Sequence, residues 1–137
     1  MLYHPARVRP ASDSDQDGIT ALGLRNWNQT HAEDPRWLTS VAEEDAIVIG
    51  FAAACLDDRE PPHDSYVHVI YVADASRLRG LGRALLRLTA ARLLAAGGRA
   101  LWMAVPSGSP ACAFWTRLGL RQIRDGIFGM LHIRTLF

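Results

Sequence analysis

The stretch that decides the fold is Tyr66-Val-His-Val-Ile-Tyr-Val-Ala-Asp-Ala-Ser-Arg77-Leu-Arg-Gly80-Leu-Gly82-Arg83-Ala-Leu-Leu86. Residues 66–72 are β-branched or aromatic apart from one histidine, which predicts a strand. Beyond the glycines, leucines recur at helical spacing on one face, while Arg83 and Arg87 lie on the opposite face. The predicted order is therefore strand, short loop and helix, with two glycines where the helix begins.

The junction between this strand and this helix is suited to an anion. The first turn of a helix leaves backbone N–H groups without intrahelical partners, and the helix dipole places positive potential there. Gly80 and Gly82 have no Cβ that would keep an anion away from those N–H groups. Arg77, Arg79 and Arg83 add positive charge around them. The sequence therefore predicts a phosphate or diphosphate at this turn.

Two common glycine motifs fit the stretch badly. A P-loop requires a lysine after its glycines, and the chain contains no lysine. A Rossmann fingerprint that starts at Gly80 would place a small residue where Leu85 stands and an acidic residue where Ala100 stands. Both nucleotide-binding families are therefore disfavoured.

The chain length and the distribution of charge limit the class of protein. With 137 residues, we expect a single domain over residues 1–137. Residues 1–64 hold 12 acids and 5 arginines, whereas residues 65–137 hold 10 arginines and 2 acids. Two interpretations stay open: ordinary solvated faces, or an anionic ligand on the second half and a cationic acceptor near the first. A nucleic-acid partner is disfavoured, because the net charge is only +1 and the arginines lack interleaved aromatic residues.

The same sequence carries no pattern of a leader or of a membrane-spanning run. Its two cysteines, Cys55 and Cys112, lack metal-ligand spacing. We therefore expect a cytoplasmic protein with no membrane partner and no bound metal.

Local signals predict the other elements. Ser12 and Asp15 resemble a capping box at the start of a helix. A turn is expected at Glu43-Glu44-Asp45, a helix end at Gly97-Gly98 and a hairpin turn at Asp125-Gly126. The other expected elements are strands at 7–11, 37–42, 47–56, 99–105, 120–124 and 127–137, a short helix after Asp34-Pro35, a loop over 57–64 and a helix over 111–118.

Two motifs resemble the GNAT N-acetyltransferase superfamily. They are Arg77-x-x-Gly80-x-Gly82 after the central strand and Ala111-x-x-Phe114-Trp115-x-x-x-Gly119-Leu120 on a later helix. The predicted element order is similar to that of the family from residue 7 to the C-terminus. The resemblance implies an α/β (α+β) fold: a mixed, mostly antiparallel sheet of about six or seven strands, flanked by about four helices. It also implies a V-shaped splay between the fourth strand, 66–72, and the fifth, 99–105.

Acetyl-CoA is the co-substrate that the resemblance implies. Its diphosphate would lie on backbone N–H groups of residues 78–83, and its pantetheine arm would run beside residues 70–72 like an extra strand. The N–H group of Ile70 would polarise the thioester carbonyl. Gly108 stands where the family often has an asparagine, and the neighbouring serines would substitute for it. The implied cofactor-binding residues are Ile70, Tyr71, Val72, Arg77, Leu78, Arg79, Gly80, Leu81, Gly82, Arg83, Ser107, Gly108 and Trp115.

Trp115 is the main departure from the family pattern. It stands where the resemblance implies a tyrosine that acts as general acid, and an indole N–H is only a hydrogen-bond donor. Trp115 either contacts the sulfur or the acyl end of the coenzyme, or is a packed core aromatic. Both interpretations stay open.

The implied catalytic residues are His68, Tyr66 and Ile70. By the two-residue period of a strand, these three and Val72 share one face. His68, with an ordinary pKa near 6.5, is the candidate base that deprotonates the amine. Tyr66 would relay a proton through water. The alternative is a half-buried strand histidine with no part in catalysis.

The resemblance therefore implies an acyltransferase that moves acetyl to a primary amine, on a small molecule or a peptide, by direct attack in a ternary complex. The alternative is a GNAT-fold module that binds acyl-CoA without turnover, as a sensor or assembly partner, because of Trp115. A homodimer is a further expectation by analogy, with Phe128, Met130 and Leu136 of an exposed final strand pairing across a twofold axis.

Overall fold

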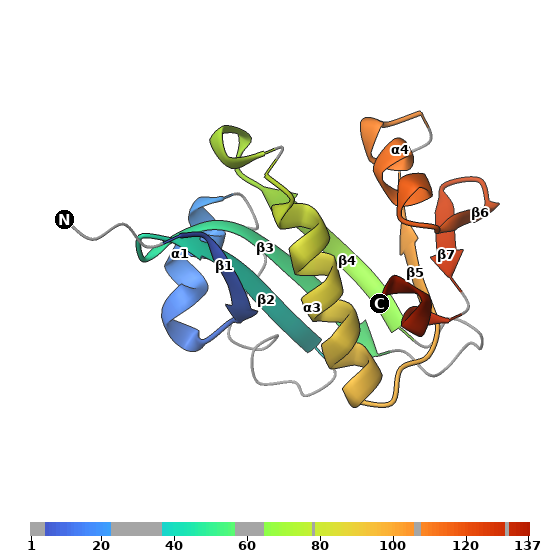
Figure 1. Ribbon diagram of the computed structural model, residues 1–137, viewed down its shortest axis with the longest axis horizontal. Helices are drawn as coiled ribbons and strands as arrows, with labels where there is room; N and C mark the ends of the chain where they lie inside the picture. Colours follow the sequence, from blue (N-terminus) through green and yellow to red (C-terminus); the bar gives the residue numbers. More distant parts are fainter. Residues whose placement is uncertain (1–4, 23–36, 57–64, 78, 106–107, 131) are drawn as a thin grey trace.

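The computed structural model describes residues 5–22, 37–56, 65–77, 79–105, 108–130 and 132–137. Within these residues the centre of the fold is a seven-stranded sheet in the order β1-β2-β3-β4-β5-β7-β6, in which only β4 and β5 run parallel (Figure 1). The mixed, mostly antiparallel sheet that the sequence predicts is confirmed. No helix in these ranges is long and apolar enough to cross a membrane.

The described elements occur in the predicted order. The strands are β1 Arg7–Pro10, β2 Trp37–Glu44, β3 Ile47–Leu56, β4 Ser65–Val72, β5 Leu101–Ala104, β6 Arg121–Arg124 and β7 Ile127–Met130. The described helices are α1 Gln16–Ala21, α3 Leu81–Ala95 and α4 Pro110–Arg117, with 3-10 turns at Asp13–Asp15, Asp74–Ser76 and Ile133–Leu136. The predicted helix after Asp34-Pro35 and the predicted loop over 57–64 lie outside the described residues.

Two helices cover opposite faces of the first four strands. Ile19 of α1 packs with Val41 and Phe51 on one face. Leu81 and Leu85 of α3 pack on alanines of β2 and β3 on the other face, where α3 lies across the strands (Figure 1). The small alanine side chains allow the helix to lie close to the sheet, so the start of α3 is packed against β2 and β3.

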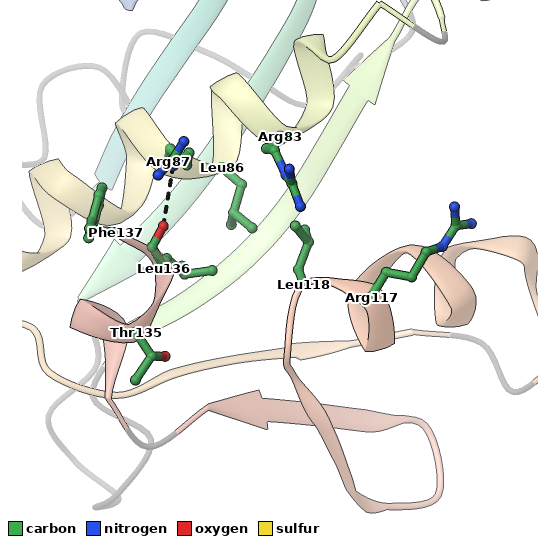
Figure 2. A pocket seen from close by; sticks show the side chains of 8 residues that line it. All are labelled: Arg83, Leu86, Arg87, Arg117, Leu118, Thr135, Leu136 and Phe137. Atoms are coloured by element: carbon green, nitrogen blue, oxygen red, sulfur yellow. Dashed lines mark hydrogen bonds between the residues drawn. The ribbon is translucent and has the colours of Figure 1, made fainter.

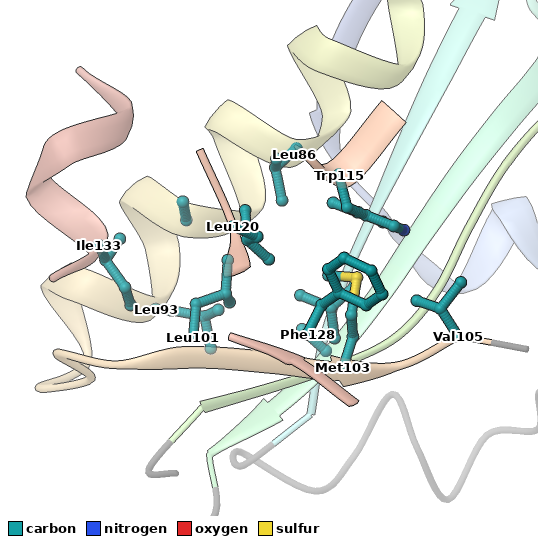
Figure 3. Close-up of a cluster of buried hydrophobic side chains, with 12 residues drawn as sticks. Leu86, Leu93, Leu101, Met103, Val105, Trp115, Leu120, Phe128 and Ile133 are labelled. Carbon is teal, nitrogen blue, oxygen red and sulfur yellow. The ribbon is translucent and has the colours of Figure 1, made fainter. Parts of the chain in front are cut away.

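The largest core cluster joins the second part of the sheet to α3 (Figure 3). Leu86 and Leu93 of α3 meet Leu101 and Met103 of β5 there. Phe128 of β7 lies among them and is only 4% exposed. This cluster packs β5 against the first four strands through side chains, in addition to the single register pair that β5 shares with β4.

Both ends of α3 are set by glycines, as the sequence predicts. Gly80 is the N-cap and has a φ of +77°, a left-handed conformation that a side chain disfavours. At the other end Gly97 has a φ of +101°, and the N–H of Gly98 donates to the carbonyl of Leu93 at 2.8 Å. That pattern is a Schellman cap, which satisfies carbonyls of the last turn.

An ion-pair network ties β1 to the start of α1. Arg9 donates to both carboxylate oxygens of Asp15 at 2.8 and 2.9 Å and to Glu43 at 2.9 Å. The backbone N–H of Ser12 donates to Asp15 at 2.8 Å, so the predicted capping box is present. The hydrogen bonds from Arg9 lower the pKa of Asp15 below its usual range. The same guanidinium, with help from Arg7, lowers the pKa of Glu43.

One predicted turn and one predicted strand end were wrong. The β2–β3 turn is at Asp45-Ala46, with φ of 51° and 64°, rather than at Glu43-Glu44-Asp45. Two positive φ values define a type I′ hairpin turn, whose twist matches the strands even though neither residue is glycine. The Asp125-Gly126 turn is confirmed, but the strand after it ends at Met130 rather than at the C-terminus.

The basis for the expected twofold pairing was also wrong. β7 lies between β5 and β6, so it is an inner strand, and Phe128 is buried in the core. The edge on that side is β6, and residues 133–136 form a 3-10 turn. A homodimer stays a prediction without this support.

Candidate functional site

The sheet opens between β4 and β5, as predicted. β4 pairs with β3 over its full length, from Ser65 to Val72. Against β5 it has a single register pair, Tyr66 with Trp102, after which the two strands diverge (Figure 1). In the described part of the chain, the β5-facing edge of residues 67–72 therefore has no strand partner and offers backbone hydrogen-bonding groups to a ligand.

The start of α3 lies beside this opening. The first intrahelical hydrogen bond runs from Ala84 N–H to the Gly80 carbonyl at 3.0 Å. The amides of Leu81, Gly82 and Arg83 precede it, and no described residue accepts from them. No acidic residue stands in this first turn to compete for them. The turn therefore meets the chemical requirements of an anion site.

The two glycines of the motif serve different purposes. A Cβ at Gly80 would meet nothing within 4 Å, so Gly80 is needed for its backbone angle rather than for space. A Cβ at Gly82 would lie 3.5 Å from the ring of Phe114 on α4, which is ordinary contact. Gly82 therefore faces the space between α3 and α4, where any longer side chain would project.

Two of the three arginines predicted around the anion are engaged within the protein. Arg77 donates to the Val72 carbonyl at 2.9 Å and pairs with Asp74 at 3.0 Å. Arg79 forms an ion pair with Glu44. The structure gives Arg83 no partner among the described residues, so it is the arginine of this loop that is available to a ligand.

A pocket of about 280 Å³ adjoins Arg83 (Figure 2). It lies between α3, the end of α4 and the C-terminal 3-10 turn, and Arg87 and Arg117 also line it. The sequence predicts Arg87 on the exposed face of its helix, but it predicts no site at either arginine. Their proximity depends on the packing of three segments that are far apart in the chain.

A β-bulge in β4 changes which side chains share a face. Ala53 of β3 pairs with Val69 and Ala54 pairs with Val67, so His68 is the extra residue. Ile70 and Val72 consequently pack in the cluster under α3, whereas Val69 and Tyr71 pack on the α1 side. The prediction that Tyr66, His68, Ile70 and Val72 share one face was wrong, because the bulge breaks the two-residue period.

Tyr66 and His68 do lie together, in an aromatic group at the closed end of the splay. The ring centroids of Tyr66 and His68 are 6.1 Å apart, and His68 is exposed. Trp102 lies 4.2 Å from Tyr66, and Trp37 lies 5.8 Å from His68. Neither tryptophan could be predicted here from the sequence, since each is an isolated strand residue far from Tyr66 in the chain.

Trp115 is a core residue. Its side chain is 6% exposed and points into the cluster with Met103 and Phe128 (Figure 3). Its ring centroid is 4.9 Å from that of Phe114. This placement favours the packed-aromatic interpretation, and a contact with the coenzyme stays a prediction.

Some predicted site residues lie outside the described part of the chain. Leu78 and Ser107 are among them, while Gly108 is described and has a φ of +77°. Within the described ranges no three His, Cys, Asp or Glu residues are grouped so as to hold a metal. The expectation of a site without metal remains a prediction.

Comparisons with known proteins agree with this geometry. A sequence model described as "Acetyltransferase (GNAT) family" matches residues 3–120. No curated protein sequence matches the chain.

Solved structures with the same architecture come from several organisms. The ribosomal-protein-S18-alanine N-acetyltransferase from Escherichia coli has a TM-score of 0.74 at 20% identity, covering 92% of this chain and 93% of its own. The PaiA N-acetyltransferase from Thermoplasma acidophilum, in complex with coenzyme A, has a TM-score of 0.73 at 15% identity, covering 91% and 98%. YhbS from Escherichia coli, in complex with CoA, has a TM-score of 0.71 at 21% identity, covering 99% and 87%. At these identities the likeness shows the fold.

Proposed function

Because this chain belongs to the acetyltransferase (GNAT) family, we propose that it transfers the acetyl group of acetyl-CoA to a primary amine by direct attack in a ternary complex. One observation carries the proposal: the partner-free amides that begin α3 lie beside the strand edge that β5 leaves uncovered. The amides are suited to an anion, and the strand edge beside them is suited to an extended chain joined to that anion.

Acetyl-CoA is the co-substrate that these two sites support. Its diphosphate would accept hydrogen bonds from N–H groups of residues 78–83, among them those of Leu81 and Gly82, with Arg83 adding charge. Its pantetheine amides would pair with the backbone of residues 70–72 in the manner of an added strand. The solved complexes of the PaiA N-acetyltransferase with coenzyme A and of YhbS with CoA, both of this fold, support the assignment.

The transfer needs few side chains. The neutral amine adds its lone pair to the thioester carbonyl carbon, which forms the C–N bond. The C–S bond then breaks with its electron pair on sulfur, and the nitrogen gives its proton to a base. The N–H of Ile70 is the proposed donor to the carbonyl oxygen while negative charge develops on it. Positioning of the two substrates in one cleft supplies most of the acceleration.

His68 is the proposed base, with Tyr66 as its relay through water. The bulge presents the exposed His68 ring at the closed end of the splay, 6.1 Å from Tyr66. An acceptor that enters on this face meets Trp37 and Trp102 as well, since both contact these rings. An imidazole is a common general base, which suits it to taking the proton from the attacking nitrogen.

The buried Trp115 is the observation that favours the alternative, an acyl-CoA-binding module without turnover. With the indole in the core, no phenol is available at that position to protonate the leaving thiolate. A thiol with a pKa near 8.5 is nevertheless a tolerable leaving group, and solvent can protonate it. Losing a general acid lowers the rate by about 10²–10⁴-fold, which slows an enzyme without silencing it.

Thiol release from acetyl-CoA across a panel of amines tests the proposed activity. We expect one amine class to release CoA in stoichiometry with acetylated product. Binding of acetyl-CoA by calorimetry with no release for any amine supports the alternative instead, and no binding refutes both.

The role of His68 is tested by His68→Gln, with exposed His132→Gln as the matched control. We expect kcat of the His68 variant to fall by at least tenfold, while the CoA affinity is kept. A wild-type kcat in His68→Gln removes this residue from the mechanism.

A further inference from the structure

A continuous row of aromatic rings crosses the sheet at the closed end of the splay. The ring centroid of Trp37, on β2, is 5.8 Å from that of His68. The His68 centroid is 6.1 Å from that of Tyr66, which in turn is 4.2 Å from that of Trp102 on β5. Rings at such separations are in contact. These four rings are called the aromatic row below, and the proposed transfer gives its two tryptophans no chemical role.

Both tryptophans point away from α3. Side chains alternate between the two faces of a strand, and the strand neighbours of the tryptophans, Leu38, Leu101 and Met103, pack in the cluster under α3. Trp37 and Trp102 therefore lie on the opposite face of the sheet. Because the start of α3 holds the proposed diphosphate on its own face, the face with the tryptophans is left for the acceptor.

The aromatic row is accessible to a small molecule. His68 is exposed, and the other three rings are half-buried rather than buried. The indole nitrogen of Trp102 is itself buried, so the part of this ring that remains exposed is hydrocarbon. Half-buried rings of this kind are stabilised when a flat apolar group covers them.

The described strands under the aromatic row place no carboxylate beside it. Across β2, β3, β4 and β5 the acids are Glu43 and Glu44, at the end of β2 opposite Trp37, and both are ion-paired with arginines. A second ammonium group on the acceptor, as in a polyamine, therefore meets no counter-charge on these strands. Such a cation would lose hydration without gaining an ion pair, whereas an aromatic ring would gain contact.

We propose that the acceptor is a primary amine that carries a flat aromatic ring on a short linker. The ring lies on the aromatic row, and the amine lies at His68, the proposed base. Since the His68 ring contacts both Trp37 and Tyr66, a nitrogen bonded to its imidazole is close to either ring. This inference rests on the proposed function, because it names the class of acceptor for the same reaction.

A matched series of amines on the wild type tests the class of acceptor. Thiol release from acetyl-CoA is measured with phenethylamine, cyclohexylethylamine and putrescine. We expect kcat/KM for phenethylamine to exceed that for putrescine by about tenfold or more. It should exceed that for cyclohexylethylamine by about 2- to 10-fold, because contacts between aromatic rings are stronger than their buried area alone predicts.

Variants of Trp37 test the place of the ring. Trp37→Leu should lower kcat/KM for phenethylamine by about 3- to 10-fold, mainly through KM, without changing kcat/KM for putrescine or the Kd of CoA. Trp37→Phe keeps a ring at this position and should keep the preference. The control is Ile47→Ala, which removes an exposed apolar side chain from the far end of β3 and should change neither quantity.

Each outcome separates this inference from the proposed function. A wild type that prefers an aliphatic amine, or that treats phenethylamine and cyclohexylethylamine alike, overturns the inference and leaves the acetyl transfer intact. Turnover of no amine overturns both. A preference that survives in Trp37→Leu, with its fold reported by its CoA affinity, places the ring elsewhere and also overturns the inference. The amine series on the wild type decides the class of acceptor without any variant.

Discussion

Gly82→Leu should separate ligand binding from folding. A side chain introduced at Gly82 would point toward the proposed diphosphate site without disturbing the fold. A helical Cβ leans toward the N-terminus, so a leucine at the second position of α3 would cover the amides of the first turn. Its Cβ fits, at 3.5 Å from Phe114, and leucine has a helix propensity better than that of glycine by up to about 0.8 kcal/mol. We therefore expect a free energy of unfolding within about 1 kcal/mol of wild type.

The same substitution should abolish binding of coenzyme A. Hydrogen bonds to a charged group contribute about 1.5–3 kcal/mol each, so losing two of them costs about 3 kcal/mol or more. That corresponds to a rise in Kd of more than about 100-fold. Calorimetry with CoA gives the affinity, and urea unfolding gives the stability.

The matched control is Ala91→Leu, which adds the same side chain to an exposed position of the same helix. It should leave both quantities unchanged. A folded Gly82→Leu protein that binds CoA with wild-type affinity would refute the assignment of the first-turn amides to the diphosphate. Gly82→Ala should be intermediate, since its Cβ alone reaches only ordinary contact distance.

Two further predictions concern stability. Asp15→Asn should lower the free energy of unfolding by about 2 kcal/mol at pH 7, because Asp15 accepts charge-assisted bonds from Arg9. The pKa of Asp15 is lowered by folding, so its contribution is present above its unfolded pKa and is lost as the pH falls through the folded one. Urea titrations should show the difference between variant and wild type closing below about pH 4, and a difference independent of pH would contradict this account. Trp115→Tyr should cost about 1–3 kcal/mol without raising kcat, since the ring points into the core beside Phe128. A higher kcat in steady-state assays would instead place the new hydroxyl in the active site.

Features that depend on adjacent residues were predicted well. The strand ending at Val72 follows from its β-branched and aromatic composition, and both ends of α3 follow from Gly80 and Gly97, where φ is positive. The Asp125-Gly126 turn follows for the same reason. In each case the residues of the element have local backbone preferences strong enough to predict it without tertiary contacts.

The mixed sheet and its opening between β4 and β5 were predicted, but several details that depend on pairing between distant segments were not. The bulge at His68 is set by how Ala53 and Ala54 align with β4, which no pattern within β4 reveals. The sequence predicted that Arg79 would bind a ligand. In the structure it pairs instead with Glu44, which lies 35 residues away in the chain. The β2–β3 turn was misplaced because Asp45-Ala46 adopts positive φ values without a glycine to indicate them.

Because β4 and β5 share a single register pair, the sheet consists of two parts: the four strands β1–β4, and the three strands β5, β7 and β6. Backbone hydrogen bonds connect the strands within each part. The two parts are connected mainly by side chains of the largest core cluster, which includes Leu86. Amide exchange should therefore resolve two cooperative units whose boundary passes through Tyr66 and Trp102. Removing a methyl group from that cluster should speed amide exchange in the three-stranded part, while the amides of the four-stranded part stay protected.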